Sequence, residues 1–205
     1  MKLNAKRLRI SEPTEVDIAK VKRRQIYIIC DNILDTYNIG SIFRLADAIG
    51  ASCVYLCGES ETPPNIKIHR AAVGTDKWVP WEYASTAVEA ISNLRSKFSP
   101  RSNNKKSVIA SEAKQSQKKI ATGSSNPRND RDWLKVVAIE QTKKSKDFRE
   151  VEYKEPIAFV VGYETSGVSK ETLAVCDEVV EIPMYGVNVS LNVMVSLAII
   201  LYQVN

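Results

Sequence analysis

Two apolar runs near the C-terminal end of the chain constrain the fold most. Ile157–Val161 and Val179–Ile182 are short, rich in β-branched residues and bounded by glycine or proline. Such runs are typical of buried strands. Polar residues follow each run: Glu164 comes after the first, and Ser190 and Asn192 come after the second. In open α/β sheets, ligands bind beyond the carboxyl ends of the strands, so we expect both segments to border a ligand crevice.

The rest of the chain alternates between strand and helix patterns. The predicted strands are Gln25–Cys30, Ala51–Cys57, Leu134–Ile139, Ile157–Gly162 and Glu178–Ile182. A first helix is predicted to begin at about Thr14. The other predicted helices are Asn38–Ile49, Ile66–Val73, Thr86–Lys97, Ser169–Val175 and Ser190–Val204. A short extended piece at Trp78–Trp81 and a polar connection at Lys143–Glu155 complete the pattern. This alternation favours an α/β fold with a mostly parallel sheet flanked by helices. The last helix is apolar nearly all round, so we expect it to be buried or to form an oligomer interface.

Positive charge is concentrated in two segments, although the whole chain has a net charge of only +5. Residues 1–25 and residues 99–132 each carry eight lysines and arginines against three acidic residues, and the remainder is net negative. Such an uneven distribution of charge along the chain is typical of nucleic-acid-binding proteins, but solvated charge on flexible segments explains it equally well. We interpret residues 1–24 as a basic N-terminal extension of a single domain, residues 25–205.

The segment 99–132 differs in composition from the rest of the chain. It contains seven serines, four asparagines and no aromatic residue. Such a segment has too little apolar surface to offset the entropy of ordering. A structureless stretch of this length is unusual inside a compact domain and needs an explanation.

The sequence predicts neither a membrane span nor a metal site. No apolar run reaches the roughly 18 residues of a membrane span, and the N-terminus lacks the apolar core of a secretory signal. The four cysteines lie in or beside apolar strand-like runs, so we expect reduced core residues in a cytoplasmic protein. Cys53 and Cys57 have no second pair of ligands near them in the sequence, which disfavours a metal site.

Three ordered motifs carry a resemblance to a known family. They read NIGSIFR at residues 38–44, GYETSG at 162–167 and IPMYGVNVSLNV at 182–193. In order and residue type they are similar to the three motifs of the SpoU/TrmH family of RNA ribose methyltransferases, which is part of the knotted SPOUT class. The resemblance covers residues 25–98 and 133–205. Relatives join these two parts through a short turn, which implies that residues 99–132 are an insertion, and we expect it to be mobile.

The resemblance implies an enzyme that transfers the methyl group of S-adenosylmethionine to a ribose 2′-hydroxyl of tRNA or rRNA, without a metal. It also implies a homodimer that assembles each RNA site from both subunits, and a C-terminal trefoil knot that holds the methyl donor. Physical rules alone would predict an ordinary unknotted sheet. The chain has no separate RNA-capture domain in its sequence pattern, which fits relatives that act on tRNA.

The resemblance also assigns site residues. The implied catalytic residues are Asn38, Arg44, Glu164, Ser190 and Asn192. The implied donor-binding residues are Ile139, Thr142, Gly162, Ile182, Met184 and Leu191. A ribose hydroxyl must lose its proton to attack, whereas a sulfonium donor needs little activation, so positioning and proton handling are the protein's tasks. Without the motifs, Ser190 and Asn192 would be interpreted as a helix N-cap pair and the apolar residues as core.

Arg44 follows Asn38 by six residues, so on an ideal helix their side chains point about 120° apart. We therefore expect Asn38 to act from the loop end and Arg44 from the helix face. In the family this arginine is proposed to activate the 2′-hydroxyl. Because an arginine is effectively always protonated, we expect Arg44 to bind a phosphate and stabilise the alkoxide instead. The single histidine, His69, lies outside the motifs, and we expect it to have a surface or supporting role.

Two other functions compete with this interpretation. A non-catalytic RNA-binding protein could retain the fold, although all five polar motif residues are present and favour activity. A flavodoxin-like nucleotide-binding domain is disfavoured because no glycine-rich phosphate loop follows the first strand. Tyr163 stands where relatives usually carry a smaller polar residue, and it could crowd the donor or simply point outward. Met194 and Ser196 replace a pair of small residues, which could change dimer packing.

Overall fold

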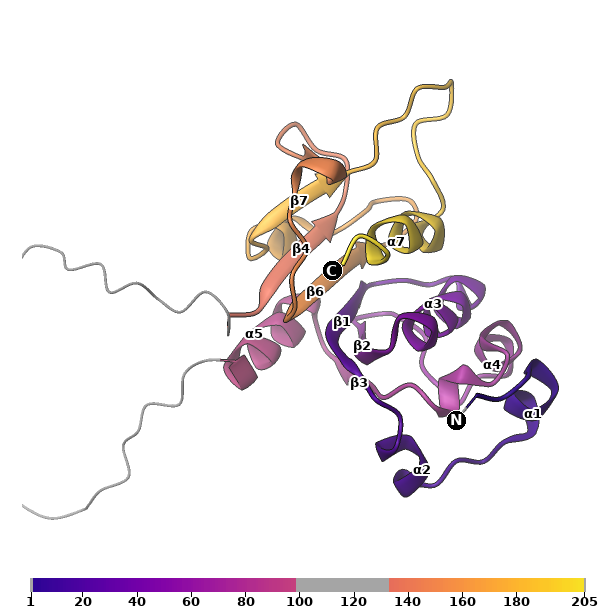
Figure 1. Ribbon diagram of the computed structural model, residues 1–205. Helices are drawn as coiled ribbons and strands as arrows, with labels where there is room; N and C mark the ends of the chain where they lie inside the picture. The colour runs from indigo at the N-terminus through magenta and orange to yellow at the C-terminus, as the bar shows by residue number, and fades with distance from the viewer. Residues whose placement is uncertain (1, 99–132, 205) are drawn as a thin grey trace, which may run out of the picture.

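A seven-stranded sheet forms the centre of the computed structural model, which describes residues 2–98 and 133–204 (Figure 1). The strands are β1 (Arg24–Asp31), β2 (Ala51–Cys57), β3 (Trp81–Ala84), β4 (Lys135–Ile139), β5 (Lys146–Asp147), β6 (Ile157–Gly162) and β7 (Glu178–Glu181). Their order across the sheet is β3-β2-β1-β6-β4-β7-β5, and neighbouring strands are parallel. The parallel sheet predicted from the alternating pattern is confirmed.

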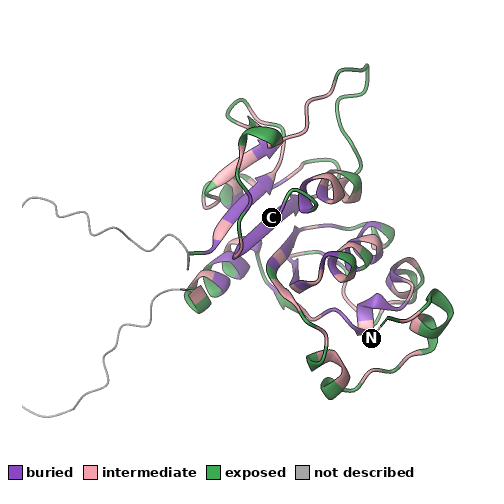
Figure 2. Ribbon diagram, in the orientation of Figure 1, coloured by how far each residue is buried: buried purple, intermediate pink, exposed green. Residues whose placement is uncertain are grey.

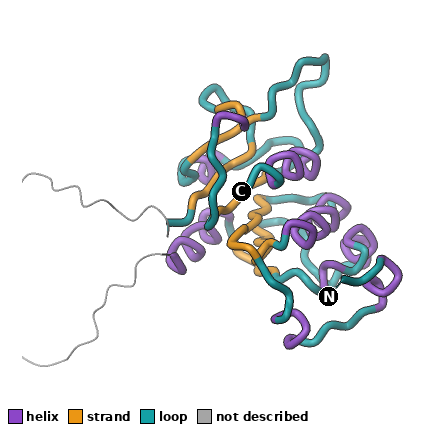
Figure 3. Tube along the Cα trace, viewed as in Figure 1, coloured by secondary structure: helices purple, strands orange, loops and turns teal. Residues whose placement is uncertain are grey.

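Helices cover both faces of the sheet (Figure 3). They are α1 (Ala5–Ile10), α2 (Glu15–Ala19), α3 (Thr36–Ile49), α4 (Ile66–Ala72), α5 (Ala87–Phe98), α6 (Lys170–Leu173) and α7 (Val193–Leu201), with short 3₁₀ turns η1 (Thr75–Lys77) and η2 (Phe148–Glu150). One buried cluster joins the sheet to α3, α4 and α7, and a second cluster joins it to α5. The strands at the centre are therefore buried on both sides (Figure 2), as parallel strands usually are.

The helix α3 shows how the first motif is placed. The carboxylate of Asp35 caps its first turn by accepting the backbone N–H of Tyr37 at 2.8 Å, and Gly50 ends it in the left-handed conformation. Gly40 lies against α4 so closely that a methyl group there would come within 2.5 Å of the Ala71 Cβ. The glycine of the first motif thus permits close packing of α3 on α4.

Several predicted elements are confirmed with small differences at their ends. β2 and β6 have the predicted bounds, and Thr14 and Asp17 form a capping box at α2. The helix with the first motif begins earlier than predicted, at Thr36, because Asp35 supplies the cap. The extended piece lies at Trp81–Ala84 instead of Trp78–Trp81, because Trp78 still belongs to the turn of η1 as its C-cap.

Two predictions about the C-terminal half are wrong. The last helix begins at Val193 and not at Ser190, because Asn192 caps it and the preceding residues form an exposed loop. The connection 143–155 contains the edge strand β5 and the turn η2, which its polar composition concealed. The predicted insertion, residues 99–132, lies outside the described residues.

The four cysteines are free thiols: Cys30, Cys53 and Cys57 are buried, and Cys176 is partly buried. Burial raises the pKa of Cys57 to about 12. Over residues 2–98 and 133–204, no helix is long and apolar enough to cross a membrane. The same residues include no group of three histidine, cysteine, aspartate or glutamate side chains that could hold a metal ion.

Candidate functional site

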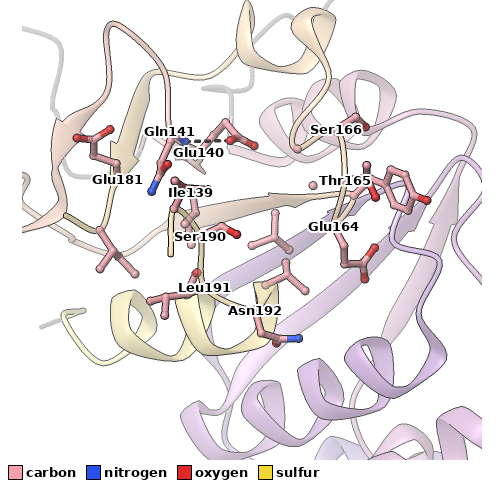
Figure 4. A pocket seen from close by; sticks show the side chains of 18 of the residues that line it. Ile139, Glu140, Gln141, Glu164, Thr165, Ser166, Glu181, Ser190, Leu191 and Asn192 are labelled. Atoms are coloured by element: carbon pink, nitrogen blue, oxygen red, sulfur yellow. Dashed lines mark hydrogen bonds between the residues drawn. The ribbon is translucent and has the colours of Figure 1, made fainter. Parts of the chain in front are cut away.

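A cavity of about 650 Å³ lies at the carboxyl ends of β4, β6 and β7. Its walls are the end of β4 with the residues that follow it, the turn after β6, and the segment that joins β7 to α7 (Figure 4). The lining residues are Ile139, Glu140, Gln141, Val161, Gly162, Tyr163, Glu164, Thr165, Ser166, Gly167, Glu181, Ile182, Met184, Asn188, Val189, Ser190, Leu191, Asn192, Val193 and Ser196. The volume falls within the range of small-molecule sites in proteins, about 300–1,000 Å³.

Asn38 joins the three motifs through hydrogen bonds at the edge of this cavity. Its Nδ2 donates to the Oε1 of Glu164 at 2.8 Å, and its Oδ1 accepts from the Nδ2 of Asn192 at 3.0 Å. Asn192 in turn accepts the backbone N–H of Met194 at 2.9 Å as the N-cap of α7. One amide side chain, only 7% exposed, therefore contacts two residues that lie 126 and 154 positions away from it in the sequence.

The turn after β6 folds back tightly on its own strand. A bridge and a backbone hydrogen bond of 2.8 Å join Tyr163 to Gly167. A methyl group at Gly162 would lie 2.2 Å from the backbone atoms of Gly167 and Val168, and Gly167 itself has a positive φ of 70°. Both glycines of the second motif are thus required by this turn, in which Glu164 is exposed at the cavity.

Most of the predicted site residues come together here. The predicted site residues that line the cavity are Ile139, Gly162, Glu164, Ile182, Met184, Ser190, Leu191 and Asn192. Asn38 contacts two of them directly. It does so from the third residue of α3 and not from a preceding loop, because the helix begins at Thr36. Ser190 lies in the exposed loop before α7, so it is not part of an N-cap pair.

Two predicted site residues, Thr142 and Arg44, do not line the cavity and take no part in the hydrogen bonds around Asn38. Thr142 instead organises the β4–β5 connection: its backbone N–H donates to the Oγ of Ser145, which donates to Glu181 at 2.5 Å. Arg44 is exposed on α3, the helix that also carries Asn38. Residues six positions apart lie on different faces of an α-helix, so Arg44 does not point toward Glu164 as Asn38 does.

His69 has a partner that its sequence neighbourhood did not reveal. Its Nδ1 lies 3.0 Å from both carboxylate oxygens of Asp76, which is buried in η1. Neither residue lines the cavity.

Sequence reasoning missed two carboxylates beside the second motif. Glu140 lines the cavity and accepts the backbone N–H of Val168 at 2.8 Å. Asp31 is buried at the end of β1 and accepts both the N–H and the hydroxyl of Ser169. The available signal was positional, because each carboxylate stands at the carboxyl end of a predicted parallel strand.

This chain is similar to several proteins that are named as RNA methyltransferases or RNA-modifying enzymes. The tRNA (guanosine(18)-2′-O)-methyltransferase of Aquifex aeolicus is 29% identical over 188 residues, which cover 91% of this chain and 72% of that protein. The crystal structure of the A. aeolicus TrmH/SpoU tRNA modifying enzyme matches with a TM-score of 0.64 at 27% identity, over 97% of this chain and 79% of that one. An AdoMet-bound rRNA methyltransferase from Sinorhizobium meliloti matches with a TM-score of 0.65 at 25% identity, and 96% of this chain spans 58% of that one.

The family comparison includes all three motifs. The sequence profile of the SpoU rRNA Methylase family matches residues 25–122 and 127–202, which is most of the chain. The matched ranges contain Asn38, Glu164 and Asn192, the side chains that the hydrogen bonds join. This chain belongs to the SpoU rRNA Methylase family.

Proposed function

We propose that this protein is an S-adenosylmethionine-dependent RNA methyltransferase that methylates a ribose 2′-hydroxyl. The observation that carries the proposal is the hydrogen-bonded chain Glu164–Asn38–Asn192, which brings the three motifs of a methyltransferase family together at one cavity. Relatives named as tRNA and rRNA 2′-O-methyltransferases support the reaction class. We favour tRNA as the substrate, because the A. aeolicus enzyme named for tRNA is 29% identical to this chain, whereas the Ralstonia nicotianae enzyme named for 23S rRNA is 25% identical.

The cavity suits the proposed methyl donor. Apolar side chains of Ile139, Ile182 and Leu191 offer a surface for an adenine ring. The carboxylates of Glu140, Glu164 and Glu181 also line the cavity, and negative groups favour a cationic sulfonium. When bound, the donor would supply an electrophilic methyl group. The residues that would hold it are those of the cavity wall, including Gly162 and Met184.

The polar residues have separable roles in this proposal. Glu164 accepts the proton of the 2′-hydroxyl or orients the group that does, and Asn38 fixes its carboxylate by donating one hydrogen bond. Ser190 and Asn192, on the segment that joins β7 to α7, position the substrate (Figure 4). The guanidinium group of Arg44 binds an RNA phosphate and stabilises the developing alkoxide.

We further propose a homodimer in which Arg44 serves the cavity of the partner chain. Two observations support this: Arg44 is exposed and outside its own cavity lining, and apolar side chains are exposed on α7 and the loop before it. The exposed apolar residues of this region are Tyr185, Val187, Val189, Leu191 and Val195, and Tyr202 is exposed directly after α7. We also propose the C-terminal trefoil knot of the family for this segment, and, from the free thiols, a cytoplasmic location.

Transfer of tritium from labelled S-adenosylmethionine to RNA tests the function. We expect the wild-type protein to label tRNA and the Arg44→Ala variant to lose labelling while it still binds the donor. A protein that binds RNA but no donor would instead be the non-catalytic RNA-binding alternative.

Mixing two inactive variants tests the shared site. Arg44→Ala and Asn192→Ala are each expected to be inactive alone. If Arg44 acts across the dimer, mixed dimers contain one complete site and regain part of the activity. If Arg44 acts within its own chain, no mixture regains activity, and the shared-site proposal is wrong.

A further inference from the structure

Two carboxylates from different strands hold the end of the second-motif turn. β6 lies between β1 and β4 in the sheet, and the chain turns back after Gly162. The backbone N–H of Val168 donates to the Oε2 of Glu140, which follows β4, at 2.8 Å. The next N–H, of Ser169, donates to the Oδ2 of Asp31, which ends β1, at 3.0 Å. Consecutive amides are thus bound by the two strands that flank β6.

Both carboxylates use their other oxygen as well. The Oε1 of Glu140 accepts the backbone N–H of Gln141 at 2.9 Å. The Oδ1 of Asp31 accepts the Nδ2 of Asn32 at 2.8 Å, and its Oδ2 also accepts the hydroxyl of Ser169 at 2.7 Å. Hydrogen bonds to an ionised carboxylate are about twice as strong as neutral ones. Asp31 is only 3% exposed, so water competes little for its oxygens.

The position of this turn decides the geometry of the site. It forms one wall of the cavity and carries Glu164, whose carboxylate accepts from Asn38. The carboxylate of Glu140 lies directly against the turn, because a methyl group on Gly167 would come within 2.0 Å of its Oε2. Release of either end of the turn would therefore displace Glu164 and the wall together.

We infer that Asp31 and Glu140 are positioning residues that clamp the 163–169 turn and thereby shape the donor cavity and place Glu164. Neither needs to touch the reacting atoms. The kinetic part of this inference rests on the proposed function, whereas the clamp itself is a property of the fold and can be measured without activity.

Four variants test the clamp: Glu140→Gln, Glu140→Ala, Asp31→Asn and Asp31→Ala. Both oxygens of Glu140 accept backbone N–H groups, so a glutamine must turn its NH₂ toward one of them. We expect E140Q to weaken binding of S-adenosylhomocysteine, measured by calorimetry, by about tenfold. The affinity of D31N for S-adenosylhomocysteine should be closer to that of the wild type than the affinity of D31A. The reason is that the side-chain oxygen of an asparagine can still accept both the backbone N–H and the hydroxyl of Ser169.

Hydrogen–deuterium exchange supplies a readout that does not depend on activity. Faster exchange confined to the peptide covering 163–169 is expected in E140Q, E140A and D31A. The matched control is Glu171→Gln, which neutralises an exposed carboxylate on the neighbouring helix α6 and should leave both readouts unchanged.

Two results would overturn the inference: E140Q with wild-type affinity and exchange, or faster exchange spread evenly over the sheet. Failure of the wild-type protein to bind S-adenosylhomocysteine would count against the proposed function instead, and the exchange data alone would then decide on the clamp.

Discussion

At the scale of single residues, the turn beside the cavity requires glycine at position 162, which has no side chain. A β-carbon at Gly162 would meet backbone atoms of the turn at 2.2 Å, and backbone cannot move aside as a flexible side chain can. We expect Gly162→Ala to destabilise the protein by about 1–3 kcal/mol, the usual cost of overpacking. Urea unfolding measures this, and Gly186→Ala is the matched control, because a methyl group there meets nothing within 4 Å. Equal stabilities of the two variants would contradict the tight turn.

Asn38 offers a second test at this scale, since it donates to a carboxylate and accepts from an amide. Asn38→Ala removes both hydrogen bonds and should cost about 1–3 kcal/mol of stability. Asn38→Asp adds repulsion between two carboxylates, so we expect it to be the less stable variant at pH 8. Acidification toward pH 5 should narrow the difference in stability between the two variants, because one proton shared by the two carboxylates restores a hydrogen-bond donor between them. Thermal unfolding at both pH values measures the effect, and a difference that does not change with pH would rule out the repulsion.

At the scale of elements, long apolar runs could be predicted from the sequence, whereas short or polar elements could not. The bounds of β2 and β6 follow from apolar runs with clear ends, and the α/β class follows from their alternation with helices. The start of α7 could not be predicted, because Ser190 and Asn192 are both good capping residues and only the contact of Asn192 with Asn38 selects between them. The strand β5 is two residues long and lies at a sheet edge, so it has almost no apolar signal. Pairing across the fold, as between Asp31 and Ser169, is likewise invisible in a single sequence.

The N-terminal helix α1 is held against the rest of the protein through the residues that follow it. Trp78 donates its indole N–H to the Oγ of Ser11 at 2.8 Å, and Lys77 pairs with Glu12, so the extension is tied to the η1 corner. Arg7 and Arg9 are exposed on α1. A basic helix held in place can contact phosphates with less entropy loss than a free tail.

We therefore expect the double variant Arg7→Ala/Arg9→Ala to bind RNA more weakly. The slope of the logarithm of the association constant against the logarithm of the salt concentration should become shallower, by roughly 0.7–0.9 for each phosphate that is no longer neutralised. Fluorescence anisotropy over a salt series measures both. Lys20→Ala is the control, since Lys20 already pairs with Asp17 at 3.4 Å. An unchanged slope in the double variant would show that α1 does not bind RNA.

At the scale of the whole molecule, the three-layer core makes stability sensitive to alkaline pH. Burial raises the pKa of Cys53, Cys57 and Cys176 to about 12, from an ordinary thiol value of 9.0, and it raises the pKa of Tyr55 to about 12 as well. Below pH 9 these groups are protonated in the folded and unfolded chains, and their contribution to stability is fully present. Between pH 9 and 12 the unfolded chain loses these protons more readily than the folded one, so the free energy of unfolding must fall as pH rises.

Urea unfolding at pH 8, 9, 10 and 11 measures this decline, and Cys176→Ser separates titration from general alkaline damage. Cys176 is only partly buried and donates to the carbonyl of Thr172, a bond that a serine hydroxyl can also form, so the substitution should disturb packing little. Because serine does not titrate in this range, the variant should lose less stability per pH unit than the wild type. A free energy of unfolding that stays constant from pH 8 to 11 would mean that the thiols ionise as easily in the folded protein as in the unfolded chain, which their burial between the sheet and its helices opposes.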